Sequence, residues 1–171
     1  MPPARQSVPV VRRARTADVR EIRELVHPLA SRGVLLAKAA VSYFESLQDF
    51  RVAQVDGVIA GCGALHVLWE DLAEIRTLAV AKEFRGHGVG SALMRRLIAD
   101  AEELGVERIF CLTFETEFFG GHGFVPIEGQ AVAHDVYAEL LRSYDEGVAE
   151  FLDLERVKPN TLGNTRMLRV L

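Results

Sequence analysis

The sequence is poor in cysteine and has no excess of basic charge. Its 171 residues include two cysteines, and 20 Lys and Arg stand against 24 Asp and Glu, which gives a formal net charge of −4 at pH 7. Cys62 and Cys111 both fall in apolar stretches typical of strands and have no metal-ligand spacing, so we expect reduced thiols of the core and no metal site. The acidic balance argues against nucleic acid as a partner, which needs a basic face.

Long apolar runs are missing as well. No stretch reaches the roughly 20 residues of a membrane span, so no membrane association is expected. Residues 1–7 lack the apolar core of a signal peptide, and we expect this segment to be disordered and the protein to be cytoplasmic. A length of 171 residues with a hydrophobic share of 49% fits one domain over residues 1–171 with its own core.

Apolar periodicity predicts a mixed α/β fold. Alternating or continuous apolar runs predict strands at 8–13, 50–55, 58–68, 72–80, 108–112, 123–127 and 166–170. Helical periodicity predicts helices at 18–29, 36–47, 88–104 and 115–122, with a mostly helical stretch over 132–152. The short connections indicate a central, mostly antiparallel sheet flanked by helices.

Several local signals mark the ends of these elements. Asp18 with Glu21 has the spacing of a capping box at a helix start, and Gly105 is typical of a helix C-cap. Asp56-Gly57 predicts a type I′ hairpin turn. A further turn is expected over residues 158–160.

A glycine-rich loop directly before the third predicted helix is the most informative motif. It reads Arg85-Gly86-His87-Gly88-Val89-Gly90, and Ser91 continues into the helical run. Glycines leave backbone N–H groups unshielded, and the first turn of a helix has four such groups without internal partners and a positive dipole end. A loop of this kind is suited to a pyrophosphate. The alternative is a tight turn without a ligand.

Two common phosphate motifs do not match this loop. A Walker A loop would end in Gly-Lys-Ser/Thr, which is absent. A dinucleotide fingerprint would follow the first strand, whereas this loop follows four strands and ends in serine. The pattern Arg-x-x-Gly-x-Gly, together with the order of elements and Phe118-Phe119-Gly120-Gly121-His122-Gly123-Phe124 near the end, resembles the GCN5-related N-acetyltransferase superfamily over nearly the whole chain.

That resemblance implies acetyl-CoA as the co-substrate. It places the pyrophosphate on the loop residues Arg85, Gly86, His87, Gly88, Val89, Gly90 and Ser91. It also places the pantetheine arm alongside Leu78, Ala79 and Val80, as an extended peptide pairs with a sheet edge.

The strand at 72–80 offers candidates for the chemistry. By a period of two, Glu74, Arg76 and Leu78 share one face. Acetyl transfer needs a neutral amine, a path for its proton and a donor for the oxyanion, so we expect Glu74 to act as a base, directly or through a water, and the Leu78 amide to hold the oxyanion. The alternative for Glu74 and Arg76 is an ion pair on a solvated face.

The acid that protonates the departing thiolate is harder to assign. Many members of the superfamily have a tyrosine in the last motif, whereas this sequence has Phe119. Thr113, at the end of its strand, is the nearest substitute, and bulk water is the alternative.

Further segments are similar to the acetyltransferase domain of N-acetylglutamate synthases, notably Arg32-Gly33-Val34-Leu35-Leu36 with Lys38, and Gly163 to Leu168. This resemblance implies acetylation of the α-amine of glutamate or glutamine, the opening step of arginine synthesis. It implies carboxylate-binding roles for Lys38, Asn164, Thr165 and Arg166. Arg76 and His66 are additional candidates on chemical grounds. Lys38 could instead be a surface lysine, and His66 a structural histidine.

Two other functions remain open from the sequence. A cationic acceptor such as a polyamine, antibiotic or protein N-terminus would need clustered carboxylates, and we interpret the available ones as the solvated face of a helix: Asp135, Asp145, Glu146, Glu150, Asp153 and Glu155. A non-catalytic acetyl-CoA sensor would keep the glycine loop and tolerate loss of Glu74. The exposed edge of a terminal strand is compatible with a homodimer.

Overall fold

The computed structural model describes residues 7–154 and 163–171. The predicted disorder over residues 1–7, apart from Ser7, and the predicted turn at 158–160 lie outside the described residues. In the described part the strands form one seven-stranded sheet in the order β1-β2-β3-β4-β5-β7-β6, which is antiparallel except for the β4–β5 pair. The strands are β1 Val10–Arg13, β2 Phe50–Val55, β3 Val58–Trp69, β4 Leu72–Val80, β5 Arg108–Thr113, β6 Val125–Pro126 and β7 Thr165–Val170.

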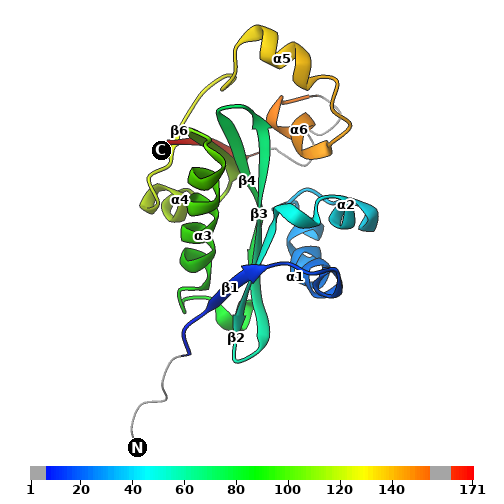
Figure 1. The fold of residues 1–171 in the computed structure, drawn as a ribbon, viewed down its shortest axis with the longest axis vertical. Coiled ribbons are helices and arrows are strands. Elements are labelled where there is room, and N and C mark those ends of the chain that lie inside the picture. Colours follow the sequence, from blue (N-terminus) through cyan, green and yellow to red (C-terminus); the bar gives the residue numbers. More distant parts are fainter. Residues whose placement is uncertain (1–6, 155–162) are drawn as a thin grey trace, which may run out of the picture.

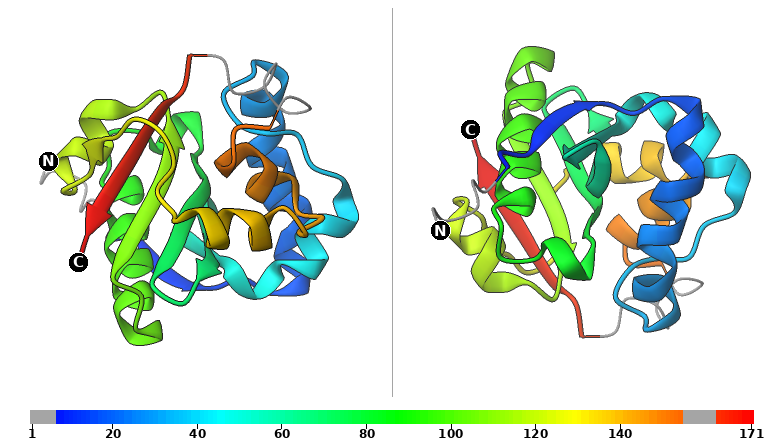
Figure 2. Two further views of the ribbon diagram at one scale, coloured as in Figure 1. Left: turned by 90° about the horizontal axis from the view of Figure 1, so that it is seen from above. Right: turned by 90° about the horizontal axis from the view of Figure 1, so that it is seen from below.

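Helices cover both faces of this sheet (Figures 1 and 2). α3 and α4 lie on one face, and α1, α2 and α6 lie on the other, with α5 beyond the turn between β3 and β4. The helices are α1 Val19–Ser31, α2 Ala40–Glu45, α3 Val89–Leu104, α4 Thr116–Gly121, α5 His134–Leu140 and α6 Glu146–Phe151, with short 3-10 turns at Thr16–Asp18, Leu47–Asp49 and Lys82–Phe84. The predicted mixed sheet flanked by helices is confirmed.

The two long helices pack through the apolar stripes that the sequence predicts. Val89, Leu93, Leu97 and Ala101 of α3 are buried against the sheet. α3 ends at Gly105, whose φ of 81° gives the left-handed C-cap expected of glycine. α1 presents its own buried stripe, with Ile22 and Val26 among it, to the opposite face.

The start of α1 differs from the prediction. Asp18 is the N-cap residue, but its carboxylate makes no capping bond within α1, so the predicted capping box with Glu21 is wrong. Instead Asp18 accepts hydrogen bonds from the Arg12 guanidinium at 2.8 Å and from the Arg15 amide at 2.7 Å. These bonds to Arg12 lower the pKa of Asp18 despite its burial. The aspartate therefore joins β1 to the helix start.

The second helix is shorter than predicted. α2 begins at Ala40, so Lys38 lies in an irregular segment, residues 32–39, and not in a helix. Leu35 packs against the core beneath α1, which draws this segment across the sheet before the helix can form. In this segment Lys38 lies next to Thr77 of β4.

β4 contains a bulge that changes the side-chain alternation. Between the pairs Cys62–Ala79 and Ala64–Arg76, β4 has one residue more than β3, and Thr77 has a φ of 58°. Leu78 consequently packs against Leu97 of α3, whereas Arg76 lies on the α6 face. The prediction that Leu78 shares a face with Glu74 and Arg76 is therefore wrong: the extra residue reverses the alternation after Arg76.

β4 and β5 separate soon after they pair. Their parallel ladder covers only Leu72–Glu74 against Arg108–Phe110, and β5 then continues with β7 as its antiparallel partner. From Ile75 onward the edge of β4 has no pairing to β5. The sheet is therefore open between these two strands at the end where the chain enters the glycine-rich loop.

The cysteines agree with the compositional analysis. Cys62 and Cys111 are both buried free thiols, as predicted, and burial raises the pKa of both, for Cys62 to about 12. Among the described residues, no helix is long and apolar enough to cross a membrane.

Close packing of α3 on β3 depends on Gly61. A Cβ at this position would lie 2.9 Å from the Ala79 carbonyl oxygen and 3.0 Å from Val89. Because backbone cannot yield as a side chain does, we expect Gly61→Ala to lower the free energy of unfolding by about 1–3 kcal/mol in urea denaturation. Gly120→Ala is the control, since a Cβ there meets nothing within 4 Å. Equal stability of the two variants would contradict this packing constraint.

Candidate active site

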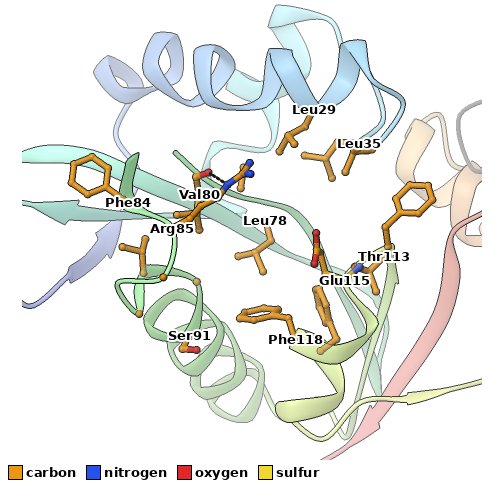
Figure 3. A pocket seen from close by; sticks show the side chains of 18 of the residues that line it. Leu29, Leu35, Leu78, Val80, Phe84, Arg85, Ser91, Thr113, Glu115 and Phe118 are labelled. Carbon is orange, nitrogen blue, oxygen red and sulfur yellow. Dashed lines mark hydrogen bonds between the residues drawn. The ribbon is translucent and has the colours of Figure 1, made fainter. Parts of the chain in front are cut away.

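A large cavity lies where β4 and β5 separate (Figure 3). It has a volume of about 630 Å³, and its walls come from the end of β4, the end of β5, the glycine-rich loop, α4 and the segment after α1. The predicted cofactor residues Leu78, Ala79 and Val80 line it. So do Arg85, Gly86, Gly88, Val89, Gly90 and Ser91, whereas His87 does not. The lining also includes residues of the 32–35 segment, for which the sequence predicted no contact with the cofactor.

The glycine-rich loop has the backbone conformation that an anion site needs. Gly86 and Gly88 both have a φ of 78°, and a Cβ on either would meet no atom within 4 Å. Gly88 is the N-cap of α3, so its neighbouring amides lie at the positive end of a 16-residue helix. Arg85 adds a positive side chain that reaches back to the Val80 carbonyl (Figure 3). These features fit a pyrophosphate.

A second, smaller cavity lies on the α6 face of β4. Its volume is about 30 Å³, and its lining includes Lys38, Glu74, Arg76, Thr77 and Glu150. Val34 and Leu35 line both cavities, which are therefore adjacent. The arrangement brings three sequence-predicted residues, Lys38, Glu74 and Arg76, into one buried group.

Arg76 is the centre of that group. Its guanidinium is held between Glu74 Oε2 at 2.9 Å and Asp145 Oδ1 at 2.8 Å, with 9% of the Arg76 side chain exposed. Burial lowers the pKa of Arg76, but the two carboxylates raise it by more. The Glu74–Arg76 ion pair considered from the sequence is present. It is not on a solvated face, since Glu74 is 2% exposed.

Asp145 and Gly147 dock α6 onto this arginine. The Asp145 carboxylate accepts the Val148 amide at 2.9 Å as the helix N-cap while it also binds Arg76. A Cβ on Gly147 would lie 2.5 Å from the Arg76 Cζ atom. Only a glycine therefore lets the first turn of α6 approach the guanidinium so closely.

Lys38 reaches the same cavity from the irregular segment before α2. Its Nζ donates to Thr77 Oγ1 at 3.3 Å. Burial, with the nearby charge of Arg76, lowers the pKa of Lys38, and the carboxylates Glu74, Asp145 and Glu150 act in the opposite direction. Lys38 is therefore a partly buried cation of the cavity and not the surface lysine considered as its alternative.

Two carboxylates of α6 and its cap were misassigned from the sequence. Asp145 and Glu150 were predicted to lie on a solvated helix face, but Asp145 pairs with Arg76 and Glu150 lines the small cavity. Burial, then the charge of Glu74, raises the pKa of Glu150 to about 7. No sequence signal marked them, because a six-residue helix is too short to show a clear apolar period. Asp135 and Asp153 are exposed, and Glu155 lies outside the described residues.

The next three candidates, Thr113, His66 and Arg166, all contact other groups of the protein. Thr113 is buried, lines the large cavity and accepts the Glu115 amide at 2.8 Å. His66 Nδ1 lies 2.6 Å from Asp49 and lines neither cavity. The Arg166 guanidinium stacks 4.8 Å from the centre of the Phe110 ring and donates to the Phe151 carbonyl.

Thr165 and Asn164 begin the last strand. Thr165 pairs with Thr113 across β5 and β7, and Asn164 precedes it. Within the described residues, the buried Asn164 Oδ1 has no hydrogen-bond partner. Neither residue lines the two cavities in this conformation, so their predicted contact with substrate stays a prediction.

The comparison with known proteins agrees with this geometry. A family model described as the acetyltransferase (GNAT) family matches residues 19–124. The chain belongs to this family. The predicted use of acetyl-CoA as co-substrate is confirmed, since solved structures similar to this chain contain CoA.

Two individual matches come from Mycobacterium tuberculosis. An amino-acid acetyltransferase of Mycobacterium tuberculosis is 56% identical over 166 residues, 95% of each chain. A structure of a protein from that organism, in complex with CoA and NLQ, has a TM-score of 0.92, with 56% identity and coverage of 95% of this chain and 99% of that one.

Longer relatives match only in part. An Aeromonas salmonicida amino-acid acetyltransferase is 30% identical, over 82% of this chain and 31% of its own length. Neisseria gonorrhoeae N-acetylglutamate synthase, complexed with coenzyme A and N-acetyl-glutamate, has a TM-score of 0.76 at 24% identity over 96% of this chain and 35% of that one. This last similarity shows the fold.

The role of the loop can be tested at Gly88. Gly88→Ala places a Cβ where the amides are open and strains a left-handed residue, so we expect the dissociation constant for CoA, measured by calorimetry, to rise about tenfold or more. Gly105→Ala is matched, because Gly105 has a φ of 81° and open space at the other end of α3. The same loss of CoA affinity in both variants would contradict a binding role for the loop.

Proposed function

We propose that the protein transfers the acetyl group of acetyl-CoA to the α-amine of L-glutamate or L-glutamine, the first step of arginine biosynthesis, in the cytoplasm. The observation that carries this proposal is the pair of cations, the partly buried Lys38 and the buried guanidinium of Arg76, in a cavity that adjoins the predicted acetyl-CoA cavity. Among the described residues, Arg76 Nε has no hydrogen-bond partner. A substrate carboxylate would supply one, in a charge-assisted bond.

The names of the relatives support the same acceptor class. The 56% identical Mycobacterium tuberculosis protein is an amino-acid acetyltransferase, and a protein with the same fold is solved with N-acetyl-glutamate. A free amino acid presents a carboxylate beside its amine, which matches cations next to carboxylates in the small cavity. A polyamine offers no anion for Lys38 or Arg76.

The chemistry follows from the position of β4 where the two cavities adjoin. The amine nitrogen attacks the thioester carbonyl from the small-cavity side, and charge develops on the carbonyl oxygen. The Leu78 amide, beyond the last β4–β5 pair, is the predicted donor to this oxyanion. The proton that the amine loses passes to a carboxylate of the small cavity, which in the described part of the chain is lined by Glu74 and Glu150.

The acceptor cavity must widen to admit an amino acid. Its 30 Å³ corresponds to about the space of one water molecule. Val34, Leu35, Leu36 and Lys38 form one wall, and they belong to the irregular segment 32–39. We therefore expect this segment to move outward as the substrate binds.

The acceptor class can be tested directly by thiol release from acetyl-CoA. We expect L-glutamate or L-glutamine to give the highest kcat/KM in a panel that includes aspartate, asparagine, spermidine, an aminoglycoside and a peptide with a free N-terminus. A preference for a cationic acceptor would overturn the proposal. No turnover with any acceptor, despite CoA binding, would favour a sensor.

Lys38 provides a test of substrate carboxylate binding. Lys38→Met keeps the apolar stem but removes a charge-assisted contact, which is worth about 1.5–3 kcal/mol. We therefore expect KM for the preferred amino acid to rise roughly 10- to 100-fold, with a smaller change in kcat. Lys82→Met, at an exposed lysine that lines neither cavity, should leave this KM unchanged. Normal KM in Lys38→Met would remove Lys38 from the substrate site.

The contribution of Glu74 to turnover can be tested by substitution. Glu74→Gln removes a carboxylate that binds Arg76 and lines the acceptor cavity, so we expect turnover to fall by at least roughly tenfold. Glu70→Gln, at the exposed β3–β4 turn, is the matched control. Near-normal turnover in Glu74→Gln, with the fold confirmed by circular dichroism, would exclude Glu74 from the mechanism.

A further inference from the structure

α6 is held in place firmly enough to fix the position of a side chain on it. Asp145 caps the helix while it binds Arg76, and Gly147 lies against the same guanidinium. On its other side Phe151 is fully buried and packs edge-on to Phe110, with ring centres 4.8 Å apart. Glu150 lies between these two anchors, and its side chain lines the acceptor cavity.

Glu150 differs from Glu74 in what its carboxylate contacts. Glu74 Oε2 is already bound to Arg76 at 2.9 Å. Over the described residues, the Glu150 carboxylate has electrostatic neighbours but no hydrogen bond. Of the two carboxylates that line the cavity, Glu150 is thus the one left to exchange a proton with a ligand.

The charges that act on Glu150 come from β4 and from the segment before α2. β4 contributes Glu74 and Arg76, and the segment before α2 contributes Lys38. Asp145, at the start of α6, pairs with Arg76. Arg166 of β7 stacks on Phe110 and Phe151 and also acts electrostatically on Glu74. Burial raises the pKa of Glu150 to about 7, Glu74 adds to the rise, and Arg76 and Lys38 oppose it. A general base is most effective when its pKa is near the working pH.

We propose that Glu150 accepts the proton of the substrate ammonium, while Glu74 is a positioning residue that holds Arg76. The ammonium gives one proton to the Glu150 carboxylate, and its freed lone pair forms the N–C bond to the thioester carbonyl. The C–S bond breaks with its electron pair on sulfur, and the second proton of the nitrogen neutralises this thiolate. Glu150 then releases its proton to solvent, so the net products are the N-acetyl amino acid, CoA and one proton.

This inference rests on acetylation of an amine in the small cavity, as proposed above. It is tested by the pH dependence of kcat/KM for the preferred amino acid. The wild-type profile should rise with pH through an inflection near 7, because the base must be ionised, and then level off. In Glu150→Gln the inflection should disappear, and kcat/KM should keep rising about tenfold per pH unit toward the pKa of the amine. At pH 7 the loss should be roughly a hundredfold or more.

Two further variants separate Glu150 from Glu74. Glu74→Gln should be slower than wild type but keep an inflection, shifted below 7, because one negative neighbour of Glu150 is gone. Glu139→Gln, at an exposed glutamate of α5, should keep the wild-type profile. An inflection near 7 that survives in Glu150→Gln, or that vanishes in Glu74→Gln, would overturn the assignment.

Two measurements that need no turnover test the role of Glu150 independently of which acceptor is used. The infrared carbonyl band of a protonated carboxyl should titrate with a midpoint near 7 in the wild type and be absent in Glu150→Gln. Since a raised pKa means that the folded protein loses stability as pH rises through 7, Glu150→Gln should also melt at a higher temperature than wild type at pH 8. Absence of turnover with glutamate and glutamine would contradict the proposed acceptor alone. Absence of the band would overturn the role of Glu150.

Discussion

The buried guanidinium of Arg76 is the interaction on which the acceptor side of the molecule depends. An arginine removed from water is destabilising unless anions and hydrogen bonds compensate it. Glu74 supplies one carboxylate from the same strand, and Asp145 supplies the other from a position 69 residues away in the chain. Because Asp145 also caps α6, the charge that stabilises Arg76 is the charge that attaches this helix to the sheet. The site and the fold are therefore stabilised by the same bonds.

The bulge at Thr77 determines the face of β4 on which Leu78 lies. Without the extra residue, Leu78 would lie on the face of Arg76. With it, Leu78 packs toward α3 and lines the large cavity, while Thr77 stays near Lys38 on the other side. One strand thus presents apolar groups to the predicted acyl-donor cavity and charged groups to the acceptor cavity. The separation of β4 from β5 after Glu74 leaves the strand edge open where the two cavities adjoin.

Features that depend on neighbouring residues could be predicted from the sequence, whereas features that depend on contacts between distant segments could not. The glycine-rich loop, the stripe of α3 and the Asp56-Gly57 turn, where both residues have positive φ, are local, and all three were predicted. Lys38 was predicted to lie on a helix, whereas it precedes α2, and the packing of Leu35 against the core in this segment is a tertiary effect. The bulge at Thr77 has no local signal: threonine rarely adopts a positive φ, and only the pairing with β3 imposes it. Asp145 and Glu150 were missed for the same reason, since their environment is created by Arg76 and Lys38 from distant segments.

The charges of the small cavity bear on how an amino acid would bind there. Lys38 and Arg76 are opposed by Glu74 and Asp145, so the state of Glu150 decides whether the buried group carries an excess negative charge. In the absence of another cation, burial and Glu74 favour the neutral form of Glu150. A substrate ammonium beside it would favour the ionised form, because an opposite charge stabilises a carboxylate. Proton transfer then converts an ammonium–carboxylate pair into an amine and a neutral acid without changing the net charge of the cavity. A buried site can activate an amine by that route because the proton transfer neutralises two opposite charges and creates no new one.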